Sequence, residues 1–130
     1  PLELLFNRLN SICCNCIIGR GAEFGPGFVL IHATGVVING RVQGGENVFI
    51  EHQVTIGAEK RQSPRIGNNV FIGAGAKVIG EVTIGDYARI GANALIGGLK
   101  NSVSLQPLSV QAQQGLNLAA GIAALTLDKR

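Results

Sequence analysis

Large aliphatic side chains recur at every sixth position through the middle of the chain. The uninterrupted run consists of Ile66, Ile72, Val78, Ile84, Ile90 and Ile96. Four residues after each of the first five comes a smaller residue, namely Val70, Ala76, Val82, Ala88 or Ala94, and glycine often follows the large one. A helix repeats every 3.6 residues, so this period excludes a helix and predicts short strands joined by corners.

The six-residue repeat predicts an all-β, triangular solenoid. Each unit supplies one short strand and one corner, and three units close a coil of about 18 residues. The large aliphatic residue points into the prism, and the small one fits where two walls converge. Successive coils would then pair as parallel strands, about 4.8 Å apart.

The same register extends towards the N-terminus, with two interruptions. Further units begin at Ile18, Phe24, Leu30, Ile38, Gly44 and Ile50. Two extra residues lie around Gly35–Val37, and Thr34 is expected to take the small inward place after Leu30. Four extra residues form a loop over residues 57–65, which carries Glu59, Lys60, Arg61 and Pro64. A charged excursion from a regular solenoid is a place where function is expected.

The two ends of the chain lack the repeat. Helical spacing of Leu2, Leu5, Phe6 and Leu9 predicts a short amphipathic helix over residues 2–10. We therefore divide the chain into an N-terminal helical remnant (1–11), a β-helix with its loop (12–98) and a C-terminal tail (99–130). The apolar residues within 116–127 are compatible with a terminal helix. The first residue, Pro1, and the absence of Met indicate a fragment or a trimmed product.

Composition narrows the function classes. Only 15% of the residues are charged, so another subunit is expected to cover part of the surface. The net charge of +3 comes from scattered basic residues and aromatics make up 5%, which argues against nucleic-acid binding. The sequence shows neither a membrane span nor a signal peptide. Three cysteines, Cys13, Cys14 and Cys16, form no disulfide framework and favour a reducing, cytoplasmic setting.

The chain has two histidines, and the repeat places them together. His32 and His52 are each third in their unit, and their units lie three apart, which is one full coil. They should therefore stack on one wall, close to the charged loop. Both could simply occupy exposed polar positions, or they could form a site, because imidazole suits general-base chemistry near neutral pH.

Three blocks of the chain resemble serine acetyltransferases. The segment from His32 to Ile38, His-Ala-Thr-Gly-Val-Val-Ile, is similar to the family's His-Ala-Thr-Gly-Ile-Val-Ile signature. The blocks at 54–57 (Val-Thr-Ile-Gly) and 72–80 (Ile-Gly-Ala-Gly-Ala-Lys-Val-Ile-Gly) match as well. The resemblance covers residues 5–97, and it implies that the hexapeptide solenoid is a left-handed parallel β-helix.

The resemblance also implies an activity. It points to an acetyl-CoA-dependent O-acetyltransferase that works as a homotrimer, with each active site between two prisms and no metal. His32 would be the general base that takes the proton of a small hydroxyl acceptor, with His52 as a second catalytic residue. Contacts to the cofactor would fall on Gly57, Ala58, Ala74, Gly75 and Lys77.

Departures from the family pattern leave the acceptor open. The family's carboxylate fifteen residues before the histidine is replaced by Ile17, and a second histidine by Ser63. His52 resembles a residue of colanic-acid-type polysaccharide acetyltransferases, so the acceptor is either L-serine or a sugar hydroxyl. Without the family's C-terminal tail, no complex with cysteine synthase is expected. The alternatives are a catalytically inactive or truncated trimeric scaffold and, far less favoured, a metal hydratase, which needs three histidines.

Overall fold

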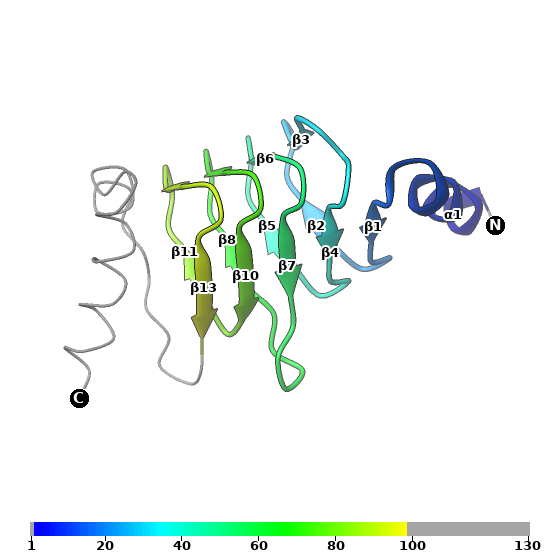
Figure 1. Ribbon diagram of the computed structural model, residues 1–130. Coiled ribbons are helices and arrows are strands. Elements are labelled where there is room, and N and C mark those ends of the chain that lie inside the picture. The colour runs from blue at the N-terminus through cyan, green and yellow to red at the C-terminus, as the bar shows by residue number, and fades with distance from the viewer. Residues whose placement is uncertain (1, 99–130) are drawn as a thin grey trace.

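The computed structural model describes residues 2–98, which form one helix and thirteen short strands (Figure 1). Helix α1 (Leu2–Cys14) lies at one end of the stacked strands. The strands form three parallel sheets. Sheet A contains β1 (Ile17–Ile18), β4 (Val37–Ile38), β7 (Thr55–Gly57), β10 (Lys77–Gly80) and β13 (Leu95–Gly98). Sheet B contains β2 (Glu23–Phe24), β5 (Gln43–Gly44), β8 (Arg65–Ile66) and β11 (Thr83–Ile84), and sheet C contains β3 (Val29–Leu30), β6 (Phe49–Ile50), β9 (Phe71–Ile72) and β12 (Arg89–Ile90). The tail at 99–130 and the helix considered within 116–127 lie outside the described residues.

The chain visits sheets A, B and C in turn and then starts the next coil. This order makes each sheet one wall of a triangular prism, as the six-residue period predicts. In the two-residue strands the first side chain points outwards and the second inwards. The inward residues Ile38, Ile50, Ile56, Ile72, Ile84 and Ile90 are fully buried. Burial of each is worth about 1.5–3 kcal/mol, and no polar side chain is buried among the described residues.

The first interruption of the repeat differs in detail from the prediction. Thr34 is exposed, whereas Val36 is fully buried at the place that Val54 takes in the next coil. Val36 occupies the inward position in place of Thr34, because burying the larger aliphatic side chain removes more apolar surface from water. The two extra residues are therefore Ala33 and Thr34, directly after His32.

The lower coils show how an inward glycine is tolerated. Gly44 occupies an inward position of sheet B, where Ile66 and Ile84 lie in the next two coils. A Cβ atom on Gly44 would lie 2.1 Å from the ring of Phe24 in the coil below. The Phe24 ring stacks on Phe28 at a centroid distance of 4.3 Å. Aromatic side chains thus fill the space that an isoleucine fills elsewhere.

Helix α1 is longer than the predicted segment 2–10 and ends at Cys14. Asn15 adopts the left-handed conformation with φ of 51°, and its N–H donates to the Ser11 carbonyl at 3.0 Å. Asparagine tolerates this conformation and so closes the helix C-terminus. The three cysteines are free thiols as predicted, and burial raises the pKa of Cys16.

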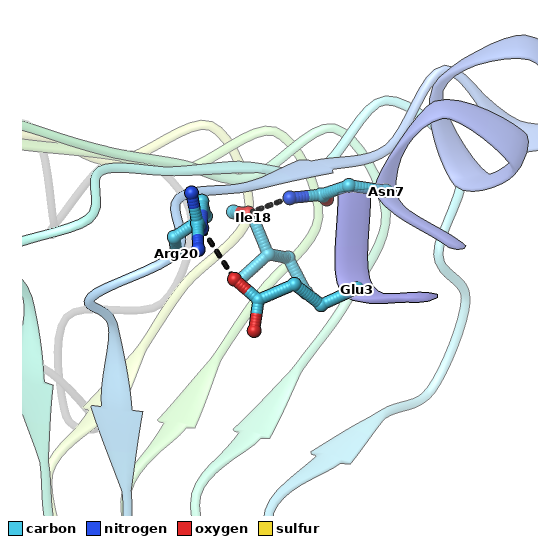
Figure 2. A network of polar contacts seen from close by, with 4 residues as sticks. All are labelled: Glu3, Asn7, Ile18 and Arg20. Atoms are coloured by element: carbon cyan, nitrogen blue, oxygen red, sulfur yellow. Dashed lines mark hydrogen bonds and ion pairs between the residues drawn. The ribbon is translucent and has the colours of Figure 1, made fainter. Parts of the chain in front are cut away.

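Polar contacts fix the helix to the first coil (Figure 2). The Asn7 side-chain amide donates to the Ile18 carbonyl at 2.8 Å, and Arg20 pairs with Glu3. These contacts hold α1 against the end of the prism that precedes the first histidine. Within residues 2–98, α1 lacks the length and apolar run needed to cross a membrane.

Candidate active site

One corner of the prism brings most of the candidate residues together in a column along the prism axis. This corner, here named the His corner, joins sheet C to sheet A. Leu30 pairs with Ile50, and Ile50 pairs with Ile72, in the ladders of sheet C. Two residues after these partners come His32, His52 and Ala74, so the three occupy equivalent places in successive coils. The predicted stacking of the histidines in successive coils is confirmed, but they lie at a corner of the prism, and the charged loop starts at another corner.

The two imidazole rings lie edge to face. Their centroids are 5.9 Å apart, and the ring planes meet at 76°. The side chains are 66% exposed for His32 and 48% exposed for His52. Both rings are therefore accessible to a small molecule from outside the prism.

Glu51 is the functional candidate that sequence reasoning missed. Its carboxylate oxygen Oε2 lies 2.9 Å from Nδ1 of His32 and 3.5 Å from Nδ1 of His52. Hydrogen bonding from His32 lowers the pKa of the Glu51 carboxyl, which is therefore ionised near neutral pH. An ionised carboxylate can only accept a hydrogen bond, so Nδ1 of His32 carries a proton and, in the neutral ring, Nε2 keeps a free lone pair.

Ile17 replaces the family's carboxylate in the sequence, and the resemblance predicts no other side-chain carboxylate beside His32. Position 17 does hold an isoleucine, but Glu51 reaches the ring from the next coil. The coil arithmetic that pairs His32 with His52 also places Glu51 beside Ile31. Because Ile31 precedes His32, this pairing of coils could have predicted that Glu51 lies close to His32.

Three of the predicted cofactor residues belong to the same corner. Ala74 continues the histidine column, and the Gly75 N–H donates to the His52 carbonyl at 3.0 Å. The Lys77 ammonium donates to the Gln53 carbonyl at 2.8 Å, which places this positive charge beside the second histidine. Gly75 has a φ of 77°, a conformation that glycine adopts without strain.

The other two predicted cofactor residues lie at a different corner. Gly57 ends β7, and Ala58 starts the loop that leads from sheet A to sheet B. At about 3.3 Å per residue, the three residues of β7 separate this loop corner from the His corner by about 10 Å. The structure therefore places Gly57 and Ala58 at the opposite edge of the wall that carries Lys77.

The loop at 57–65 leaves the prism as a small hairpin, visible below β7 in Figure 1. Glu59 and Gln62 exchange two backbone hydrogen bonds of 2.8 Å around Lys60 and Arg61, which both have positive φ. The Ser63 hydroxyl donates to the Asn39 side chain at 3.2 Å, which ties the loop to its own prism. Because the loop starts at another corner, the predicted cover of a histidine site would have to come from a neighbouring chain.

A pocket of about 390 Å³ opens beside this loop. Its lining consists of Lys60, Arg61, Gln62, Ser63, Arg65, Glu81, Val82 and Thr83. The basic residues outnumber the one acidic residue, so the pocket suits an anionic group.

The histidine cluster also has the ligand types of a metal site. Ligand atoms of His32, Glu51 and His52 all lie within 4.8 Å of one another. Imidazole and carboxylate groups bind transition metals such as zinc. The same groups serve general-base chemistry without an ion, so assays of this site need a chelator as a control.

Curated relatives match the chain in sequence. It is 44% identical to the serine acetyltransferase of Helicobacter pylori over 83 residues, which cover 61% of this chain and 48% of the relative. It is 45% identical to that of Mycobacterium tuberculosis over 83 residues, covering 61% of this chain and 36% of the relative. The chain spans less than half the length of these curated relatives.

Solved structures match the fold. A serine acetyltransferase in complex with CoA has a TM-score of 0.68 and 30% identity, over 80% of this chain and 48% of that one. The Neisseria gonorrhoeae serine acetyltransferase in complex with serine has a TM-score of 0.68 and 34% identity, over 79% of this chain and 41% of that one. The resemblance to serine acetyltransferases and the left-handed parallel β-helix are thus confirmed. The model of a family described as "Protein of unknown function (DUF992)" matches residues 56–128, more than half of the chain.

Proposed function

The chain belongs to the family described as "Protein of unknown function (DUF992)", which names no activity, and we propose that it is an acetyl-CoA-dependent O-acetyltransferase. The acceptor class is a small molecule with a free hydroxyl, with L-serine first among the candidates. The observation that carries the proposal is the hydrogen bond between His32 and Glu51, inside a fold similar to serine acetyltransferases. It leaves Nε2 of His32 ready to accept a proton.

In the proposed reaction His32 acts twice. Its Nε2 takes the proton of the acceptor hydroxyl while the hydroxyl oxygen attacks the thioester carbonyl carbon. The carbon–sulfur bond then breaks, and the imidazolium returns the proton to the departing CoA sulfur. The proton gained in the first step is the proton lost in the second, so the enzyme is regenerated unchanged.

The wall of sheet A is the proposed surface for the cofactor. Ala74 and Gly75 keep the His corner free of bulky side chains, and Lys77 brings a positive charge that suits a phosphate group. Gly57 and Ala58 are small residues at the far edge of the same wall. A long, extended cofactor arm lying across sheet A would contact both sets of residues.

We propose that the chain works as a trimer of parallel prisms, because its walls differ in character. The outward residues of sheet B are polar, namely Glu23, Gln43, Arg65 and Thr83. On either side of the His corner, by contrast, Ile17, Val29, Ile31, Val37 and Phe49 are each at least 36% exposed. An apolar patch of this kind is typical of a subunit interface, and a neighbouring prism would shield the histidines from bulk water. Sedimentation that finds a stable monomer at micromolar concentration would contradict this assembly.

A thiol-release assay tests the activity directly. The protein is incubated with acetyl-CoA and a chelator against a panel of amino-acid and sugar acceptors, and free CoA is measured. Turnover with L-serine supports the proposal as stated, and turnover with a sugar alone moves the acceptor to the polysaccharide class. CoA binding without release on any acceptor would indicate the inactive scaffold.

A further inference from the structure

We propose that Glu51 is the positioning residue for His32, an inference that rests on the proposed acetyltransferase function. The hydrogen bond of 2.9 Å joins side chains from adjacent coils, since His32 follows β3 and Glu51 follows β6. The structure therefore assembles the base and its orienting carboxylate across the ladder of the β-helix.

The two partners differ in how firmly the backbone holds them. Glu51 lies in a regular corner, where its N–H donates to the Ile72 carbonyl at 3.0 Å and its side chain is only 22% exposed. His32 lies at the corner that is two residues longer than its equivalents, and its ring is mostly exposed. A long corner with an exposed ring fixes the imidazole poorly, so the rigid carboxylate above it is what selects one orientation.

The contact has two chemical consequences for the base. It holds the proton on Nδ1, so the lone pair of Nε2 points away from Glu51. When Nε2 takes the hydroxyl proton, the resulting imidazolium lies directly beside a negative charge, which lowers the energy of that state. Glu51 itself gains no proton, so its role is to orient and stabilise His32.

His52 contacts the same carboxylate oxygen as His32. At 3.5 Å its Nδ1 makes a looser contact than that of His32. The carboxylate therefore makes its stronger contact with His32, and the contact with His52 is secondary.

Nitrogen-15 NMR of the imidazoles tests the inference without any substrate. With two histidines in the chain the spectrum holds two ring systems, which a His32→Ala sample assigns. Spectra are recorded with EDTA at about pH 8.5, about two units above the ordinary imidazole pKa. The matched variants are Glu51→Ala and Glu23→Ala, the second removing an exposed carboxylate from sheet B.

The expected result is that wild type and Glu23→Ala carry the His32 proton on Nδ1, whereas Glu51→Ala shifts it towards Nε2. A wild-type ring protonated on Nε2, or an unchanged tautomer in Glu51→Ala, would overturn the inference. Circular dichroism should be the same in all three proteins, because Glu51 fills no core position.

Steady-state kinetics of the acetyl transfer provide a second test of the inference. Glu51→Ala should lower kcat by about 10- to 100-fold, less than loss of the base itself, with KM for acetyl-CoA within about twofold of wild type. An unchanged kcat would overturn the positioning role. If wild type turns over no acceptor, the proposed function fails, and the NMR result alone decides whether Glu51 sets the tautomer.

Discussion

Replacing His32 by alanine removes the proposed base without touching the core. The side chain is 66% exposed, and its hydrogen bond to Glu51 lies on the surface of the prism. The substitution opens no cavity, so the free energy of unfolding should change by no more than about 0.5 kcal/mol. Activity and stability are therefore separable in this variant.

The expected loss of turnover follows from the chemistry of a general base. Such a base contributes about 10²–10⁴-fold, equivalent to about 2.7–5.4 kcal/mol at the transition state. The ring is accessible from outside the prism, so water can partly replace it, and we expect the lower half of this range. KM for acetyl-CoA should stay within about twofold, because the base contributes to the transition state and not to cofactor binding.

The assay is steady-state thiol release with wild type, His32→Ala and the control Gln43→Ala. Gln43 is exposed on sheet B, away from the His corner, so its loss should leave kcat unchanged. Full activity of His32→Ala would refute the mechanism and leave the His-Ala-Thr-Gly block as a feature of the fold alone. Equal losses in both variants would indicate a general effect on the protein.

Three further outcomes are expected. His52→Ala should lower kcat less than His32→Ala, because its Nδ1 lies 3.5 Å from the carboxylate instead of 2.9 Å, and the double variant should resemble His32→Ala. Tyr87 has a φ of 62° at the corner position that Asn47 and Asn69 occupy in the preceding coils, and asparagine tolerates this left-handed conformation better than tyrosine. Tyr87→Asn should therefore raise the free energy of unfolding by about 0.5–1 kcal/mol, and a lower Tm would contradict this. The hydrogen bond from His32 holds the pKa of Glu51 below 4.5, so its stabilising effect is present above that pH and lost as the pH falls through the lowered pKa. The difference in Tm between wild type and Glu51→Gln should therefore be constant above about pH 4.5 and narrow as the pH falls below that value.

The fold was predictable because its main stabilising contacts repeat. A period of six assigns every inward position, and the stacking of coils follows by counting, which is how His32 and His52 were placed together. The same counting places Ala74 above them. Where the repeat is regular, sequence distance converts directly into position in space.

The repeat does not specify which side chains fill the space around a position. Gly44 lies inward as predicted, and the Phe24 ring in the preceding coil fills the space that an isoleucine would occupy. Val36 replaced Thr34 because the larger side chain gains more from burial. The Glu51 contact depends on the direction of an exposed side chain, which periodicity does not specify.

Residues of the histidine column are far apart in sequence but adjacent in space. His32, His52, Ala74 and Ala92 follow one another at sequence intervals of 20, 22 and 18 residues, yet they occupy equivalent places in consecutive coils. The extra residues are absorbed at the corners, and the ladder on both sides of the loop stays in register. Extra residues at a corner therefore leave the histidine column in register. Related chains can differ in the length of a corner loop while the residues equivalent to His32, His52 and Ala74 stay above one another.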